Sequence, residues 1–78
     1  MNYCEKQLEQ EITLHDYCFD LATTAKLSEV SAYACAREVV EVYAEAYTGN
    51  IKQDAATARK LIAEFTKYLD HINRNPSS

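Results

Sequence analysis

Histidine and cysteine are the residue types of this chain best suited to metal binding or nucleophilic catalysis. His15 and Cys18 are three residues apart, so on a helix they share one face, where they could hold a metal together with Cys4 or His71. Neither a Cys-x-x-Cys nor a His-Glu-x-x-His motif occurs, and a structural zinc needs a complete tetrahedral ligand set. We therefore expect no metal and no cofactor here, but a hydrogen-bonded histidine beside a packed thiol.

Catalysis by Cys18 would need a thiolate in an electropositive, partly open site. The nearby carboxylates of Glu11, Asp16 and Asp20 would instead raise the pKa of a thiol. The chain also has a single glycine and hence no glycine-rich loop to hold an oxyanion. The sequence therefore predicts a non-enzymatic protein with no catalytic residue.

Carboxylates form the second candidate site, because four of them share the outer wedge of the first expected helix: Glu5, Glu9, Asp16 and Asp20. Regularly spaced acids are usually the solvated face of a helix, and no calcium-binding loop motif is present. One alternative stays open. This acidic surface could belong to an inhibitor of the kind that mobile elements encode, which occupies a basic nucleic-acid-binding groove on a target protein.

Charge is divided unevenly along the chain. Residues 1–50 hold nine acidic and three basic side chains, a net charge of −6, whereas residues 51–78 hold three acidic and five basic ones, a net charge of +2. A total of −4 disfavours direct binding to nucleic acid or to an anionic membrane, since both attract positive surfaces. We therefore expect protein partners, one of them a second copy of the chain.

Composition predicts one helical domain in the cytoplasm. Of 78 residues, 47% are hydrophobic, and the chain has one glycine and one proline, which is typical of a helical protein. No apolar run reaches the ~18 residues that a membrane span needs, and the start does not resemble a signal peptide. Three cysteines cannot all pair within one chain, so we expect reduced thiols and a cytoplasmic location.

Apolar periodicity and capping residues predict three helices, at about 3–25, 29–48 and 51–73, in a single domain 1–73 with a flexible tail 74–78. A break is expected at 26–28, where Ser28 can cap the second helix. Gly49 can adopt the left-handed conformation that ends that helix. Asn50, followed by Gln53, resembles a capping box for the third helix, with Asp54 as an alternative cap.

Residues 46–50 (AYTGN), followed by Gln53, Asp54 and Ala58, resemble the turn between the helices of Sel1-type repeats. The resemblance covers about a dozen residues, and the chain has no second copy of them, whereas a solenoid needs about three repeats. It implies a helix-turn-helix connection at this point, and no function of that family is carried over.

Short connections favour antiparallel neighbours, hence an all-α three-helix bundle, completed by helix packing in a homo-oligomer. The middle helix is apolar over roughly 200° of its circumference, more than the ~100° that one neighbour covers, so we expect a second partner, another copy or a target. A small-residue side is expected to pack within the chain: Ala32, Cys35, Val39, Val42 and Ala46. An aromatic side is expected to form the interface: Tyr33, Ala36, Val40, Tyr43, Ala44 and Tyr47.

The leading hypothesis is a small, non-enzymatic, helical interaction and regulatory protein that acts as a homodimer. Its working residues would be the aromatic side of the middle helix. In the acidic-inhibitor alternative, they would be the four carboxylates of the first helix.

Overall fold

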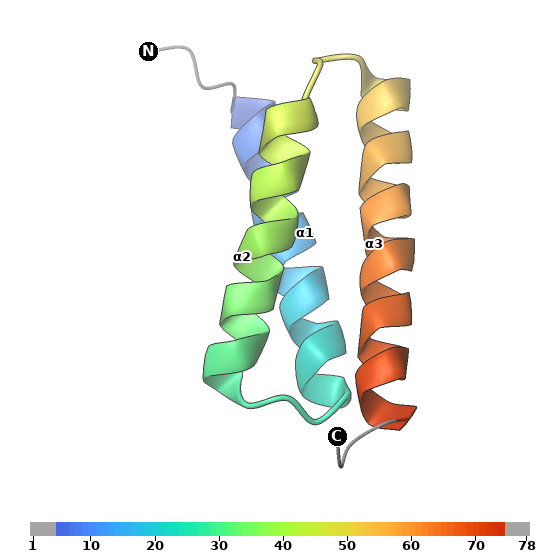
Figure 1. Cartoon of the computed structure of the whole chain (residues 1–78). Coiled ribbons are helices and arrows are strands. Elements are labelled where there is room, and N and C mark those ends of the chain that lie inside the picture. Colours follow the sequence, from blue (N-terminus) through green and yellow to red (C-terminus); the bar gives the residue numbers. More distant parts are fainter. Residues whose placement is uncertain (1–4, 75–78) are drawn as a thin grey trace.

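The computed structural model describes residues 5–74, which form three α-helices joined by short loops. The helices are α1 (Glu5–Thr24), α2 (Glu29–Ala46) and α3 (Ile51–Arg74). Figure 1 shows them running alternately down, up and down along one axis, so that each helix is antiparallel to the next. The predicted all-α three-helix antiparallel bundle is therefore confirmed, whereas its completion by a second copy stays a prediction.

The break between α1 and α2 lies where the sequence predicts it. Lys26 has a φ of 77°, a left-handed conformation that stops α1. Ser28 is the N-cap of α2, and its hydroxyl accepts a hydrogen bond from the backbone N–H of Ser31 at 3.2 Å. The chain therefore reverses direction within four residues, 25–28.

The helix ends differ slightly from the predicted ones. α2 ends at Ala46 and not at 48, and Arg74, predicted to begin the tail, is the last residue of α3. The start of the first predicted helix, at residues 3 and 4, and the remainder of the tail, 75–78, lie outside the described residues.

The connection between α2 and α3 is held by side chains from both of its ends. Gly49 has a φ of 86°, and the Asn50 carboxamide accepts a hydrogen bond from the backbone N–H of Gln53 at 3.1 Å, as predicted for a helix N-cap. Asp54 has a different role from the predicted alternative cap. Its carboxylate reaches back to accept three hydrogen bonds of 2.9 Å from residues 48 and 49.

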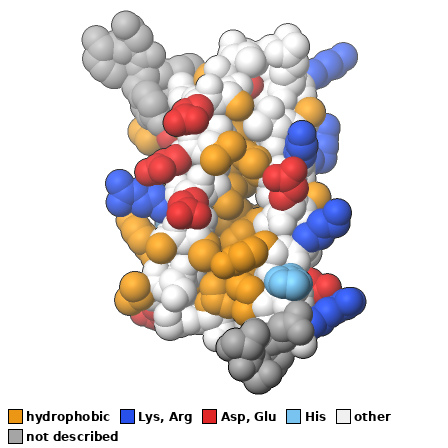
Figure 2. Space-filling model, in the orientation of Figure 1, with side chains coloured by type: hydrophobic (Ala, Val, Ile, Leu, Met, Phe, Trp, Pro, Cys, Tyr) orange, Lys and Arg blue, Asp and Glu red, His pale blue; other side chains and the backbone are white. Residues whose placement is uncertain are grey.

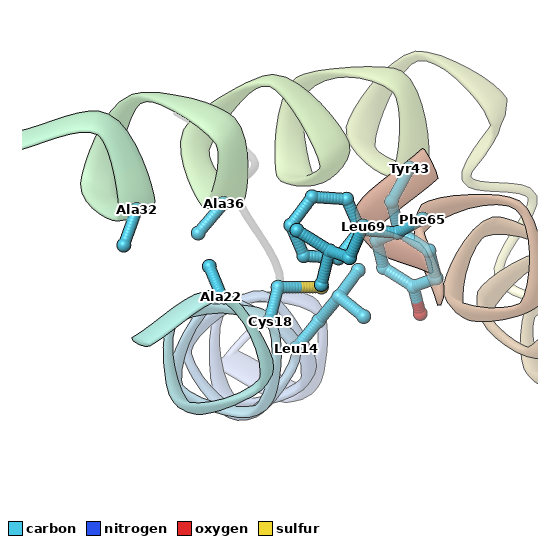
Figure 3. Close-up of a cluster of buried hydrophobic side chains, with 8 residues drawn as sticks. All are labelled: Leu14, Cys18, Ala22, Ala32, Ala36, Tyr43, Phe65 and Leu69. Atoms are coloured by element: carbon cyan, nitrogen blue, oxygen red, sulfur yellow. The ribbon is translucent and has the colours of Figure 1, made fainter. Parts of the chain in front are cut away.

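Small side chains bring α1 and α2 together. Ala22 of α1 and Ala32 and Ala36 of α2 are fully buried, and Figure 3 shows them facing one another across the helix pair. Side chains this short allow two helix backbones to approach closely. Larger residues fill the rest of the core: Leu14, Cys18, Tyr43, Phe65 and Leu69.

The middle helix has two neighbours within the chain, α1 and α3, whereas the sequence led us to expect the second partner to be another copy or a target. α2 packs closely against α1, and α3 covers a second side of it with Phe65 and Leu69, which are 6% and 5% exposed. The broad apolar arc of α2 is thus partly explained within one chain, because a central helix has two neighbours. Val30, Tyr33 and Val42 of α2 nevertheless stay 81%, 55% and 50% exposed.

Within residues 5–74, none of the helices combines the length and the hydropathy required to cross a membrane.

Candidate protein-interaction surfaces

Two of the six residues expected at the interface lie instead inside the bundle. Ala36 is 0% and Tyr43 is 2% exposed, and the Tyr43 hydroxyl donates a hydrogen bond to Oε1 of Gln10 on α1. Both are therefore part of the core of a single chain, where Ala36 faces Ala22 of α1. Of the other four, Tyr33 is exposed, and Val40, Ala44 and Tyr47 are half-buried.

The side of α2 expected to pack within the chain is only partly buried. Ala32 is fully buried, and Cys35 and Val39 are half-buried, but Val42 is 50% exposed and Ala46 is also exposed. The expected division of α2 into an inner and an outer side is therefore wrong by a rotation about its axis. Both sides contribute to the core, and both leave apolar residues at the surface.

One apolar surface lies on α1 and α2, on the side turned away from α3. At 100° per residue, its α1 residues project about 120–160° from the core residue Leu14, whereas Thr13 and Tyr17 project toward α3. We call this surface the α1/α2 face. It consists of the exposed Leu8 and Ile12 of α1 and Val30 and Tyr33 of α2, bordered by four half-buried residues, Phe19, Val40, Ala44 and Tyr47. Phe19, Val40 and Tyr47 also pack against the core. Four of its residues are large and exposed, namely Leu8 (45%), Ile12 (53%), Val30 (81%) and Tyr33 (55%).

An aromatic contact links the two helices within the α1/α2 face. The rings of His15 and Tyr33 meet edge to face, with centroids 4.9 Å apart and an angle of 67° between their planes. Such contacts stabilise aromatic pairs by about 0.5–1.5 kcal/mol beyond their burial. His15 therefore positions the Tyr33 ring at the surface, a role that differs from the metal ligand weighed for it.

A second apolar surface is a groove between α2 and α3, on another side of α2. It has a volume of about 340 Å³ and is lined by four residues of each helix. We call it the α2/α3 groove: Cys35, Glu38, Val39 and Val42 of α2, and Leu61, Glu64, Phe65 and Tyr68 of α3. Figure 2 looks onto this side and shows hydrophobic side chains continuous between the two helices, with acidic side chains along α2.

A hollow with a volume of about 470 Å³ lies between α1 and the start of α3. Leu14, Ala58 and Ile62 contribute to its apolar wall, and Tyr43 and Asp54 lie at its inner end. The volume falls within the range of small-molecule sites, about 300–1,000 Å³. Among the described residues, every buried side-chain nitrogen and oxygen already has a hydrogen-bond partner, so the polar groups at this hollow that could meet a ligand are the exposed ones, such as Glu9 and Arg59.

The Tyr43 hydroxyl has an acidic environment. Burial raises the pKa of this phenol, and the carboxylates of Asp54 and Glu11 raise it further, as does Tyr47. The neutral hydroxyl is therefore stabilised, and it donates a hydrogen bond to Oε1 of Gln10. Tyr43 is thus a buried structural hydrogen-bond donor. The sequence placed it on the same aromatic side of the middle helix as Tyr33, which is exposed.

Cys18 lies in the core and not at an open site. It is 0% exposed, and burial raises the pKa of its thiol to about 11. Desolvation alone accounts for this rise, without the carboxylate contribution that the sequence suggested. At neutral pH the group is therefore an uncharged, packed thiol, which disfavours a nucleophile.

Metal ligands are not gathered around His15 and Cys18 in the part of the chain that the structure describes. There, no group of three or more His, Cys, Asp or Glu side chains could hold a metal ion. Cys4, the other ligand weighed for such a site, lies outside the described residues.

The four acids proposed for an inhibitory surface are all exposed: Glu5, Glu9, Asp16 and Asp20. Glu5, Asp16 and Asp20 project from the side of α1 that faces neither α2 nor α3, whereas Glu9 lines the hollow between α1 and α3. Exposed, regularly spaced carboxylates are expected both on a solvated helix face and on a docking surface for a basic protein. The inhibitor hypothesis therefore stays a prediction.

Comparison of the chain with protein-family models, with curated proteins and with solved structures found no match.

Proposed function

We propose that this chain is a non-enzymatic, regulatory protein-interaction module that pairs with a second copy of itself through the α1/α2 face. The observation that carries the proposal is the exposure of Leu8, Ile12, Val30 and Tyr33 on one side of the α1 and α2 pair. Large exposed apolar side chains gathered on one side of a small protein are typical of association sites. A bundle of this size also gains stability from additional burial.

A two-fold axis parallel to the helices would place α1 of one copy against α2 of the other. The two α1 and α2 pairs would then form a four-helix bundle, with each α3 on the outside. In such a closed, isologous dimer the same residues of both copies meet. The α1/α2 face of each copy therefore becomes buried without leaving a further site open for polymerisation.

Charges at the edges of the α1/α2 face support this pairing. Tyr33 contacts His15, so Arg37, one turn further along α2, is level with Ile12 on the antiparallel α1. A two-fold axis along the bundle preserves this height, and Arg37 would meet the partner copy's α1 near Asp16, which is exposed. Arg37 forms an exposed pair with Glu41, at 3.6 Å, and an exposed pair costs little to exchange.

The mass in solution tests the proposal. Light scattering should give twice the 8.9 kDa of the single chain at micromolar concentration. Tyr33→Glu and Ile12→Glu each bury a charge in the dimer and should give a monomer whose circular dichroism spectrum is unchanged. Their matched control is Tyr17→Glu, because Tyr17 is 50% exposed but faces the side of α1 near α3. A single-chain mass for the unaltered protein would overturn the proposal, as would dimers in both face variants.

Cysteine chemistry supports the expectation of a reducing, cytoplasmic location. Cys18 is buried and Cys35 half-buried, and the two form no disulfide with each other, which agrees with the reduced thiols of an intracellular protein. Detection of the protein in cytosolic rather than secreted fractions would test the expectation.

A further inference from the structure

We propose that the α2/α3 groove docks an amphipathic helix from another protein, with Lys or Arg residues of that helix along α2. This inference uses different residues from the proposed self-pairing and does not depend on it. A helix is the expected occupant because grooves between two helices take helical segments, which insert apolar residues spaced three, four and seven apart.

The apolar part of the groove supplies the contact area. Val39 and Leu61 are half-buried beneath it and Phe65 is buried, whereas Val42 and Tyr68 stand at its sides and are 50% and 52% exposed. Tyr68 is held against Phe65, with ring centroids 6.5 Å apart and an angle of 18° between the planes. Stacking fixes a large side chain at the surface before binding, which lowers the conformational entropy lost on association.

Charge along the groove determines the chemistry of the partner. Glu38 lines the groove, and Glu45 is exposed seven residues further along α2, two turns or about 10 Å away on the same side. Arg37 is the sole basic residue of α2, and it projects away from the groove and pairs with Glu41. Across the groove, Glu64 adds a third carboxylate, and the cations of α3 lie beyond it on the outer side of that helix.

These charges disfavour the other possible occupants. A second copy could offer its own α2/α3 groove, which carries Glu38 and Glu64, or its α1/α2 face, whose edge carries Asp16. In both cases acidic residues would oppose acidic ones. The outer side of α3 is basic, but its apolar residues are turned inward to the core. Anionic lipid and nucleic acid would be repelled by Glu38, Glu45 and Glu64.

Synthetic helices test the partner chemistry directly. The probe is a fluorescent peptide of about 18 residues, a length that supports a helix, with leucines along one face and lysines flanking them. Its matched control carries glutamates in place of the lysines. In fluorescence anisotropy we expect the lysine peptide to bind at least about tenfold more tightly than the glutamate peptide, with an affinity that falls as salt is added.

Variants of the protein locate the site. Val42→Glu should weaken binding of the lysine peptide about tenfold or more while leaving the mass in solution unchanged, whereas Tyr33→Glu should not alter peptide binding. The double variant Glu38→Lys with Glu45→Lys should reverse the preference between the two peptides. Glu5→Lys with Asp20→Lys makes the same change of net charge on α1 and should preserve the preference.

Three results would overturn the proposal. The first is equal affinity for the lysine and glutamate peptides. The second is an equal loss of lysine-peptide binding in the groove variant (Glu38→Lys with Glu45→Lys) and the α1 variant (Glu5→Lys with Asp20→Lys). The third is binding to anionic phosphatidylserine vesicles that Val42→Glu abolishes, together with no binding of either peptide. Tyr33→Glu and Val42→Glu change different surfaces. If the self-pairing fails, the unaltered protein has the mass of a single chain, and if the groove proposal fails, Val42→Glu leaves peptide affinity unchanged.

Discussion

Replacing Asp54 by alanine should strongly destabilise the bundle, although Asp54 belongs to neither apolar surface. Its side chain is 2% exposed and accepts hydrogen bonds of 2.9 Å from Thr48 N, Thr48 Oγ1 and Gly49 N. These bonds fix the start of α3 relative to the end of α2. The carboxylate therefore holds the first turn of α3, while Phe65 and Leu69 hold the rest of that helix in the core.

The expected loss follows from these three bonds. Hydrogen bonds to a charged acceptor contribute about 1.5–3 kcal/mol each, but Thr48 and Gly49 are exposed, so water replaces part of what is lost. We expect Asp54→Ala to lower the free energy of unfolding by about 3 kcal/mol. A chain of this length has about 4–12 kcal/mol in total, so the melting temperature should fall by on the order of 15 °C.

Urea unfolding followed by far-ultraviolet circular dichroism measures this loss, with an unchanged m-value showing that the same surface unfolds. Asp54→Asn keeps the shape and one acceptor oxygen, so its loss should be intermediate. The matched control is Asp70→Ala on the same helix. Asp70 is exposed and pairs with Arg74 at 3.3 Å, so its removal should change stability by less than about 0.5 kcal/mol. The reasoning is refuted if Asp54→Ala and Asp70→Ala have equal effects.

Three further changes test the core and the turn. Burial raises the pKa of Cys18 from its ordinary value of 9.0 to about 11, so the unfolded chain loses this proton first and stability should fall as pH rises from 9 to 11. The free energy of unfolding should fall by about 2–3 kcal/mol over this range, as measured by urea unfolding. The Cys18→Ala variant should not show this fall, and an equal fall in both proteins would show that Cys18 is not its cause. Tyr43→Phe removes the donor to Gln10 and should cost about 1 kcal/mol by urea unfolding, and a neutral result would show that water replaces the bond. Gly49→Ala should cost about 1–2 kcal/mol in thermal melts, because a Cβ at a φ of 86° is strained while nothing within 4 Å would collide with it; an unchanged melting temperature would show that the turn relaxes.

Much of the backbone could be predicted because its signals are local. Ser28 and Asn50 can accept hydrogen bonds at helix starts, and Gly49 can adopt a positive φ, in whatever context they occur. Helix type and number followed from apolar spacing for the same reason. The helix ends differed slightly from those expected, as at Ala46, since the last turn of a helix depends on local competition between hydrogen bonds.

The orientation of α2 could not be predicted from its own residues. A helical projection gives angles about one axis, but it does not say at which angles the neighbouring helices lie. Tyr33 and Tyr43 belong to the same aromatic side of the sequence, yet one is 55% and the other 2% exposed. Only the packing of α1 and α3 distinguished them.

The sequence by itself determined three amphipathic helices, their order and the excess of apolar surface on the middle one, because these depend on residue type and spacing within single segments. The tertiary structure alone decided where that excess lies, on the α1/α2 face and in the α2/α3 groove. It also decided that Asp54 binds residues of the preceding turn and that Glu11 is buried, at 8% exposure. Such features depend on the distance between segments, which follows from how side chains of different helices fill the space between them.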